Sequence, residues 1–271
     1  MRNWKKWIAM AMVGVMMCIG TACGSSTEKT TEKHTEKTEQ VTLTIAAAAS
    51  LEYSMKERLI PMFEQANEGV TVEGVYDSSG KLQTQIEEGL GADIFFSAAT
   101  KQMDTLAEEG YMDTATIKNR LENKLVLIVP KDSKGSIKEF KDIEKAKTIA
   151  IGDPESVPVG QYSKEALTNL GVWDTIQDNI SFGTNVTEVL NWVAEGSADA
   201  GIVYATDAAT TDKVSVIAEA PEGSLAEDVV YPVGVLKNSE NKEMAEKFVQ
   251  FLCSDDASKV LKQYGFTPIS E

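Results

Sequence analysis

Four short segments of the chain place small or hydroxyl-bearing residues where a helix is expected to begin. Each follows a predicted strand, and the segments are Ala47–Leu51, Tyr76–Lys81, Gly152–Gln161 and Gly183–Thr187. A helix N-terminus exposes main-chain N–H groups and a positive dipole potential, and serine hydroxyls add further donors. Several such ends converging on one point would bind an anion without any lysine or arginine. A single serine or asparagine at a helix start is more often an ordinary cap, so the inference depends on all four segments.

The region of predicted strands and helices contains no histidine, a residue on which many enzymes depend. The single histidine, His34, lies in a hydrophilic segment before the first predicted strand. Histidine-based triads, histidine general bases and histidine-ligated zinc are therefore excluded from the predicted domain. A serine nucleophile also needs an adjacent base, and near Ser79 only Lys81 is close in sequence. We expect a binding protein with no catalytic residues, no cofactor and no direct metal ligands. A serine-dependent enzyme using Ser50 or Ser79 remains a remote alternative.

Strands and helices alternate along the segment from residue 41 to residue 271. Predicted strands are 41–45, 70–76, 91–98, 124–129, 148–151, 180–182, 200–204, 214–218 and 229–236. Helical patterns follow most of them and close the chain at its C-terminus. Alternation of this kind favours parallel-type α/β sheets, which bind ligands at the carboxyl ends of their strands.

The first residues have the pattern of an export signal. Three cations precede an uncharged, mostly apolar run from Trp7 to Gly20, which is too short to span a membrane comfortably. The segment Gly20–Ser26 resembles a bacterial lipobox, which implies cleavage of residues 1–22 and lipid attachment at Cys23. Residues 23–40 repeat Thr-Glu-Lys without apolar side chains and are expected to form a disordered spacer. An ordinary cleaved signal peptide is the alternative. We expect the protein to be anchored to the outer face of the cell membrane.

The formal net charge of −16 argues against nucleic acid as a partner, because phosphate backbones attract basic surfaces. Solubility is the simpler interpretation of this charge. No disulfide framework is possible either, because Cys253 is the only cysteine left after the signal and the lipid site.

Over nearly all of residues 41–271 the sequence resembles the periplasmic molybdate-binding protein family of ABC importers. The resemblance rests on segments that include Ala47–Leu51, Ser78-Ser79, Gln85–Gly89, Ala92–Phe95, Gly152–Glu155, Val157-Pro158, Gly160–Tyr162, Lys164–Leu167, Gly201–Tyr204, Asp207-Ala208, Tyr231–Val233 and Tyr264–Phe266. It implies an α/β fold of two lobes, of the type II periplasmic-binding-protein kind, with the ligand cleft between them. Lobe 1 would comprise 41–123 and 239–271, and lobe 2 would comprise 124–238. The crossings near Asn123 and Lys237 would serve as the hinge.

The resemblance also implies the ligand groups. Ser50 and Ser79 match two serine ligands from lobe 1. Val159 and Val186 match main-chain N–H donors from lobe 2, and Tyr204 matches a tyrosine whose hydroxyl reaches the anion. The ligand would be molybdate or tungstate. The partners would be an ABC permease with its cytoplasmic ATPase, and the protein would be a monomer.

Two positions depart from this pattern. Gly80 stands where some relatives have a third serine. Asp77 precedes the serine pair, and we expect its carboxylate to point outward or to cap the following helix.

Several alternatives stay open at this stage. A donor-only site favours a fully deprotonated dianion, because the proton of monohydrogen phosphate would lack an acceptor, at a cost of roughly 1–3 kcal/mol. That argument leaves sulfate as a possible ligand beside molybdate and tungstate. A lipoprotein that only mediates adhesion or signalling is the remaining alternative.

Overall fold

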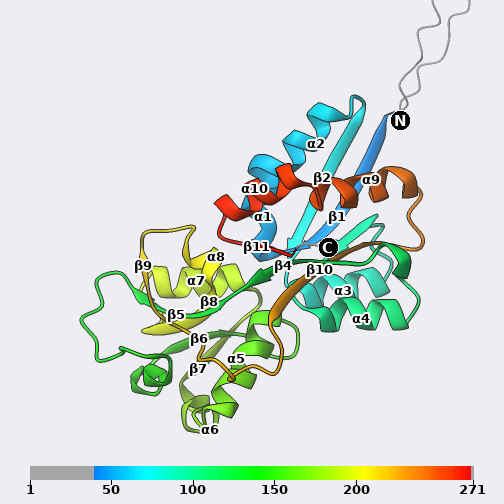
Figure 1. The fold of residues 1–271 in the computed structure, drawn as a ribbon. Coiled ribbons are helices and arrows are strands. Elements are labelled where there is room, and N and C mark those ends of the chain that lie inside the picture. The colour runs from blue at the N-terminus through cyan, green and yellow to red at the C-terminus, as the bar shows by residue number, and fades with distance from the viewer. Residues whose placement is uncertain (1–39, 270–271) are drawn as a thin grey trace, which may run out of the picture. The chain divides into compact units, whose positions relative to one another are not determined.

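The computed structural model describes residues 40–269. The predictions for the signal peptide, for Cys23 and for the spacer up to residue 39 lie outside the described residues. Within the described range the chain forms two mixed β-sheets with helices packed against them (Figure 1). This arrangement confirms the predicted α/β fold class.

The first sheet has six strands in the order β11-β4-β10-β3-β1-β2. They are β1 (Val41–Ala48), β2 (Val70–Asp77), β3 (Ile94–Phe96), β4 (Lys118–Asn123), β10 (Val229–Val235) and β11 (Thr267–Pro268). Strand β1 runs parallel to β2 and β3, whereas β10 runs antiparallel to β3 and β4.

The period-two alternation of β1 and β3 divides the apolar side chains between the two faces of this sheet. Ala46 and Phe95 pack with the buried residues of α3 (Ser79–Glu87) and α4 (Thr100–Glu108). Ile45 and Phe96 belong to the core on the other face. That core includes buried residues of the segment from α1 (Glu52–Ser54) through η2 (Met55–Leu59) to α2 (Ile60–Ala66), and of α9 (Lys242–Leu252) and α10 (Asp255–Gln263).

The second sheet has five strands in the order β7-β6-β8-β5-β9. They are β5 (Leu125–Pro130), β6 (Ile149–Gly152), β7 (Ile180–Gly183), β8 (Ala200–Tyr204) and β9 (Val214–Glu219). Its helices are α5 (Pro158–Asn169), α6 (Trp173–Ile176), α7 (Val186–Ala194) and α8 (Ala205–Ala208). The remaining short elements are 3-10 turns: η1 (Ala49–Leu51), η3 (Thr114–Thr116), η4 (Phe140–Lys145) and η5 (Gln177–Asn179).

Each sheet contains the same three-strand pattern. The chain passes from β1 to β2 on one side and then back to β3 on the other, so the order is β3-β1-β2. It repeats this from β6 to β7 and back to β8, giving β8-β6-β7. The winding direction reverses at the first strand of each triplet, and crevices at the carboxyl ends of such strands are where open α/β sheets bind ligands.

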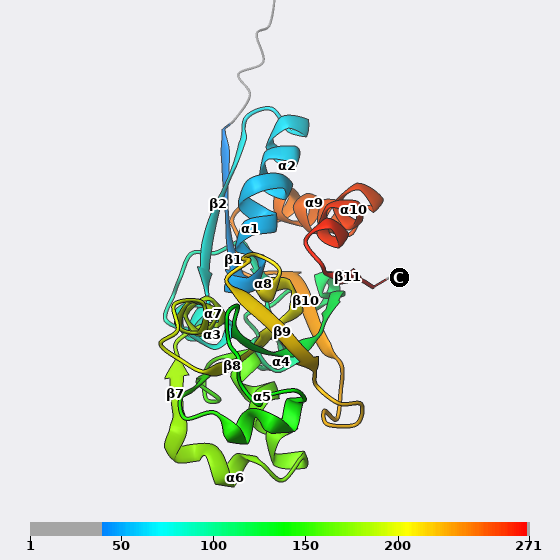
Figure 2. The same ribbon diagram turned by 90° about the vertical axis from the view of Figure 1, so that its left-hand side faces the viewer.

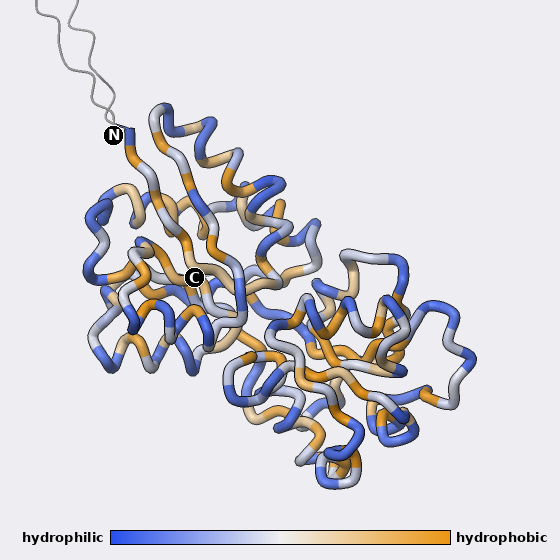
Figure 3. The backbone as a smooth tube through the Cα atoms, turned by 180° about the vertical axis from the view of Figure 1, so that it is seen from behind, coloured by the Kyte–Doolittle hydropathy of each residue, from blue (hydrophilic) through white to orange (hydrophobic). Residues whose placement is uncertain are grey.

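The chain passes between the two sheets twice. The first crossing lies at Asn123 and Lys124, between β4 and β5. The second lies in residues 220–228, between β9 and β10. We name the part 41–123 with 229–269 the first lobe and the part 124–228 the second lobe. Apolar segments run through the strands of both lobes, and hydrophilic segments follow their outer loops (Figure 3).

The predicted second crossing near Lys237 was therefore wrong. Strand β10 pairs with β3 and β4, which places residues 229–238 with the first sheet and not in the second lobe as predicted. The strand is antiparallel because the chain re-enters the first sheet from the side on which the second lobe lies. The prediction of parallel-type sheets holds only for the two triplets, since β5 also pairs antiparallel with β8 and β9.

None of the helices between residues 40 and 269 combines the length and apolar character needed to cross a membrane.

Candidate functional site

All five residues predicted to bind the ligand line one small cavity between the two lobes. The space in it that a water-sized sphere can occupy is only about 10 Å³, far below the range of about 300–1,000 Å³ typical of sites for drug-sized molecules. Beside Ser50, Ser79, Val159, Val186 and Tyr204, the lining residues are Ala48, Ala49, Asp77, Ser78, Ala98, Val157 and Pro158. A space of this size excludes all but a small ligand.

The lining comes from the carboxyl ends of six strands, three in each lobe. Ser50, Ser79 and Ala98 follow β1, β2 and β3 of the first lobe. Val159 and Val186 follow β6 and β7, and Tyr204 is the last residue of β8 in the second lobe. The two points at which the winding direction reverses thus face one another across the cavity. The side view shows how the two lobes are stacked (Figure 2).

Three helices begin at the cavity, as the four strand–turn–helix segments predicted. Helix α3 starts at Ser79, α5 at Pro158 and α7 at Val186. The first N–H groups of a helix have no partner within the helix, so those of Ser79, Val159 and Val186 are available to a ligand. The fourth segment enters the short 3-10 turn η1, which contains Ser50.

Helix α5 reaches the cavity because two glycines let its first turn lie against the end of β6. A Cβ atom at Gly160 would lie 2.0 Å from the carbonyl oxygen of Gly152, and one at Gly152 would lie 2.7 Å from Cγ1 of Val157. No side chain fits either position without moving the main chain or Val157. The glycines therefore fix where the Val159 N–H group lies.

Both predicted serines have their hydroxyl oxygens engaged by neighbours. Ser79 is fully buried, and its Oγ accepts a hydrogen bond from the main-chain N–H of Ala98 at 2.9 Å. Ser50 Oγ lies 3.0 Å from the hydroxyl of Tyr231. A serine hydroxyl that accepts one hydrogen bond keeps its own proton to donate.

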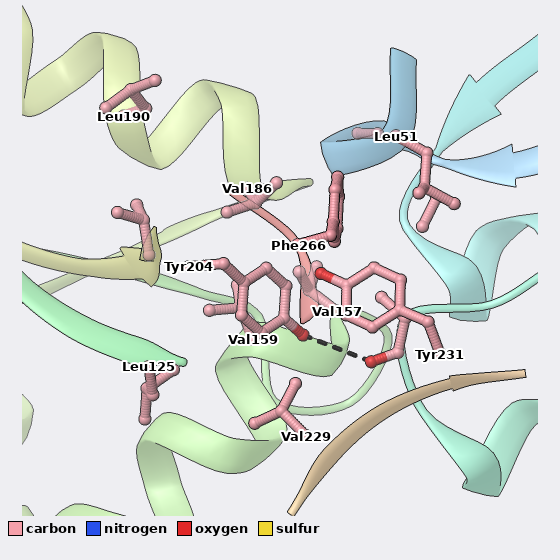
Figure 4. Packing of buried hydrophobic residues seen from close by; sticks show 14 of the residues in the cluster. Leu51, Leu125, Val157, Val159, Val186, Leu190, Tyr204, Val229, Tyr231 and Phe266 are labelled. Atoms are coloured by element: carbon pink, nitrogen blue, oxygen red, sulfur yellow. Dashed lines mark hydrogen bonds between the residues drawn. The ribbon is translucent and has the colours of Figure 1, made fainter. Parts of the chain in front are cut away.

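Tyr204 lies at the inner wall of the cavity, packed edge-on against Tyr231 with ring centroids 5.6 Å apart (Figure 4). Its hydroxyl is 3.5 Å from the carbonyl oxygen of Ala98, a long contact that a stronger acceptor can replace. Burial raises the pKa of Tyr204 well above its usual value, so the hydroxyl keeps its proton and stays a donor.

Asp77 is the one charged residue among those lining the cavity. Its Oδ1 accepts from the main-chain N–H of Ser78 at 2.8 Å, and Lys81 Nζ and Asn185 Nδ2 each lie 3.4 Å away. The carboxylate is thus bound to donors just before helix α3 begins. These contacts oppose the repulsion that a free carboxylate would exert on an anion.

Gly80 lies at a contact between the two lobes. Its main-chain N–H donates to the carbonyl oxygen of Ser156 in the second lobe at 3.0 Å. A Cβ atom at this position would lie 2.3 Å from the same oxygen. The glycine that departs from the family pattern therefore permits this approach of the two lobes.

Sequence reasoning missed three polar groups near the cavity. Ser78 Oγ is buried without a hydrogen-bond partner among the described residues and lies beside the predicted Ser79. Tyr231 contacts Ser50, and Asn123 Nδ2 lies 3.1 Å from the hydroxyl of Tyr231. The segment Tyr231–Val233 belongs to the resemblance, but nothing in the sequence pattern places it next to Ser50.

The other hollows are less suited to an anion. A larger one of about 320 Å³ lies beside the second crossing and is lined by Lys124 and by four carboxylates, those of Glu219, Glu222, Glu227 and Asp228. Within residues 40–269 no group of three or more histidine, cysteine, aspartate or glutamate side chains could hold a metal ion. The small cavity is therefore the site that we assign to a ligand.

Comparison with known proteins agrees with this geometry. Residues 43–267 match the family described as bacterial extracellular solute-binding protein. The molybdate-binding protein ModA of Escherichia coli (strain K12) is 37% identical over 231 residues, covering 83% of this chain and 88% of that protein. YvgL of Bacillus subtilis (strain 168), named as an ABC transporter substrate-binding lipoprotein, is 40% identical over 229 residues, covering 84% and 87%. The solved structure of the periplasmic molybdate-binding protein of Azotobacter vinelandii is 25% identical, with a TM-score of 0.73 over 83% of this chain and 98% of that chain.

A buried carboxylate lies in the helix that follows Tyr204. Asp207 is 4% exposed, and its Oδ2 has no hydrogen-bond partner among the described residues. Burial raises its pKa to about 7, well above the usual value of an aspartate. The folded state therefore binds the proton more tightly than the unfolded chain does. Stability from this group is complete below the unfolded pKa and is lost as the pH rises through about 7.

We predict that Asp207→Asn gains stability relative to the wild type as the pH rises. The difference in free energy of unfolding should move in favour of the variant by roughly 2–3 kcal/mol between about pH 5 and about pH 8. Urea unfolding of both proteins at the two pH values measures it. The control Asp256→Asn removes an exposed carboxylate whose pKa is lowered by Lys259, so its effect should stay constant over this range. An Asp207→Asn difference that is equal at both pH values would contradict the prediction.

Proposed function

Because the chain belongs to the family of bacterial extracellular solute-binding proteins, we propose that it captures molybdate and tungstate outside the cytoplasm and delivers them to an ABC importer permease. The observation that carries this proposal is the cavity at which six strand ends meet, with hydrogen-bond donors from both lobes. The molybdate-binding relatives supply the choice of anion.

The donors around the cavity are neutral, which favours a small dianion held by hydrogen bonds. Helices α3, α5 and α7 each direct the positive end of the dipole at the same point. The hydroxyls of Ser50, Ser79 and Tyr204 add side-chain donors, and Ser78 adds a buried hydroxyl that has no hydrogen-bond partner among residues 40–269. No lysine or arginine lines the cavity within the described residues. Charge neutralisation therefore comes from main-chain and hydroxyl groups.

This donor set discriminates between oxyanions by their protons. Molybdate, tungstate and sulfate offer only acceptors, so each oxygen can be matched by a donor. Monohydrogen phosphate carries a proton that needs an acceptor. The main-chain N–H groups supply none, and the Asp77 carboxylate at the cavity already accepts from Ser78, Lys81 and Asn185 through Oδ1. Leaving the proton unmatched in a dry site costs roughly 1–3 kcal/mol. Molybdate differs from sulfate in size, and the choice of molybdate over sulfate depends on the molybdate-binding relatives.

An anion held by both lobes stabilises the arrangement in which they meet. Ser50 and Ser79 contribute from the first lobe, and Val159, Val186 and Tyr204 from the second, so binding favours the closed form over an open one. We propose the crossings at Asn123 and at residues 220–228 as the hinge. The closed, loaded form is the species that would dock on the permease, whose ATPase lies in the cytoplasm. We propose that the protein acts as a monomer.

Titration calorimetry of the purified protein, freed of anion by unfolding and refolding, tests the function. We expect one molybdate or tungstate per chain, with sulfate much weaker and phosphate weaker still. Ser79→Ala and Tyr204→Phe should each lower the molybdate affinity by roughly ten- to hundredfold, because each removes a donor to a charged ligand. Tight sulfate binding with weak molybdate binding would keep the class and overturn the anion. Absence of binding by all four anions would contradict the proposal.

We predict that Gly80→Ala weakens molybdate binding without destabilising the fold. Alanine in a helix stabilises by roughly 0.5–1 kcal/mol relative to glycine, so the anion-free protein should resist urea at least as well as the wild type. The added methyl group would meet Ser156 as the lobes close, and overpacking of about 1–3 kcal/mol corresponds to a loss of roughly tenfold or more.

The matched control for this change is Gly91→Ala. A Cβ atom at Gly91 has no neighbour within 4 Å, so molybdate affinity should remain as in the wild type. Unchanged affinity in Gly80→Ala would show that the lobes do not approach at this point when the anion is bound.

We further propose that Cys23 carries the lipid that holds the protein at the outer face of the membrane. The lipobox-like segment and the lipoprotein name of the Bacillus subtilis relative support this. Wild-type cells should incorporate labelled palmitate into the protein, and Cys23→Ala should abolish the label and release the protein from the membrane. Equal labelling of both proteins would contradict lipid attachment at Cys23.

A further inference from the structure

Three polar side chains form a continuous hydrogen-bonded chain from the first crossing to the cavity. Asn123 ends β4, Tyr231 lies in the neighbouring β10, and Ser50 follows β1. Asn123 Nδ2 lies 3.1 Å from the hydroxyl oxygen of Tyr231, which lies 3.0 Å from Ser50 Oγ. Tyr231 is fully buried, so its hydroxyl depends on these two neighbours and on the hydroxyl of Tyr204 rather than on bulk water.

The orientation of the Asn123 amide sets the direction of this chain. Its Oδ1 accepts from the main-chain N–H of Lys124 at 2.9 Å. The other end of the amide, Nδ2, therefore faces Tyr231 and also Thr206 Oγ1, which lies 2.9 Å away in helix α8 of the second lobe. An amide nitrogen only donates, so the hydroxyl oxygen of Tyr231 must accept from Asn123.

The hydrogen bond between the hydroxyls of Tyr231 and Ser50 can run in either direction, and once Tyr231 accepts from Asn123 its own proton is free to point at Ser50. Burial raises the pKa of Tyr231 well above its usual value, so the hydroxyl keeps this proton at any physiological pH. Ser50 Oγ then accepts from Tyr231, and the proton of Ser50 remains to be donated. Because Ser50 lines the cavity, an oxyanion there is the acceptor that this proton meets.

The second serine reaches the same state by a simpler route. A main-chain N–H, that of Ala98, can only donate, and it donates to Ser79 Oγ at 2.9 Å. Ser79 therefore also keeps its proton for the cavity. Ser50 would thus receive its hydrogen bond from the linked side chains of Asn123 and Tyr231, whereas Ser79 receives its hydrogen bond from one main-chain N–H group.

We propose that Asn123 and Tyr231 are positioning residues that order the proton of Ser50, so that this hydroxyl faces the bound anion as a donor. This inference rests on the proposed function and names the device by which the site rejects a protonated oxyanion. Thr206 extends the device to the second lobe, since the same amide nitrogen bonds both lobes at the first crossing.

Tyr231→Phe removes the proton donor and keeps the ring. Ser50 can then rotate and accept, so the site should lose affinity for molybdate and lose less for monohydrogen phosphate. We expect molybdate affinity to fall roughly tenfold and the ratio of molybdate to phosphate affinity to narrow. Titration at mildly alkaline pH, where both anions are dianions, measures the ratio without a difference in ligand charge.

A second variant reverses the chain instead of breaking it. In Asn123→Asp a carboxylate replaces the donating amide, so Tyr231 would donate to residue 123 and accept from Ser50. Ser50 would then present a lone pair to the cavity. The added negative charge weakens both dianions alike, so the molybdate-to-phosphate ratio isolates the change in proton order. We expect this ratio to fall at least as far as in Tyr231→Phe.

A double-mutant cycle separates positioning from general damage. In a Ser50→Ala background, Tyr231→Phe should change molybdate affinity by less than about twofold, because its effect passes through Ser50. The matched control Tyr264→Phe removes a tyrosine hydroxyl that bonds an exposed carboxylate, Glu57, at 2.8 Å, and should leave affinity unchanged.

The outcomes distinguish a failure of the proton-ordering role from a failure of the proposed anion-binding function. A wild type that binds molybdate, together with an unchanged ratio in both Tyr231→Phe and Asn123→Asp, would overturn the proton-ordering role and leave the function intact. A full additive effect of Tyr231→Phe in the Ser50→Ala background would overturn it too. A wild type that binds no oxyanion would instead remove the proposed function on which the inference rests.

Discussion

The structure depends on one constraint, which is that the carboxyl ends of two strand triplets meet across a single small cavity. Each triplet reverses its winding direction at the first strand, so each leaves a crevice at its own carboxyl edge. Helices that start at those edges turn unpaired N–H groups into the cavity from both sides. An anion placed there satisfies groups that neither lobe could satisfy alone. Binding and closure are therefore the same event in this account.

Residues around the cavity allow the strand ends of the two lobes to approach and orient the polar groups between them. Glycines at positions 80, 152 and 160 remove side chains where main chains must approach. Ser79 Oγ accepts from the buried N–H of Ala98, and Ser50 Oγ is hydrogen-bonded to the buried hydroxyl of Tyr231. Asn123 lies where the chain passes from one sheet to the other and bonds Tyr231 in the first lobe and Thr206 in the second. The crossing thus takes part in the polar arrangement of the site as well as in the path of the chain.

Local patterns in the sequence were enough to predict α/β sheets and to find the segments that hold four of the five residues that the structure brings together, while the two lobes and the choice of residues came from the resemblance. Strand–turn–helix segments are short-range features, and Ser50, Ser79, Val159 and Val186 each lie in one of them. Tyr204 came from the resemblance alone. Their role as ligands stays a prediction.

The groups that the sequence did not reveal depend on long-range pairing. Tyr231 meets Ser50 only because β10 returns antiparallel to the first sheet, 181 residues further along the chain. The same return moved the second crossing from Lys237 to residues 220–228, since an apolar strand does not show which sheet it will join. Gly80 was noted as a departure, but its close approach to Ser156 belongs to the second lobe and has no local signature.

A crystal structure of the protein with molybdate tests the central claim most directly. The account predicts one tetrahedral anion in the cavity, with each oxygen accepting from hydroxyl or main-chain donors and with both lobes contributing. Ser50, Ser79, Val159, Val186 and Tyr204 should all lie within hydrogen-bond distance, and no lysine or arginine should contact the anion. An anion held by one lobe alone, or bound through basic side chains elsewhere on the surface, would contradict it.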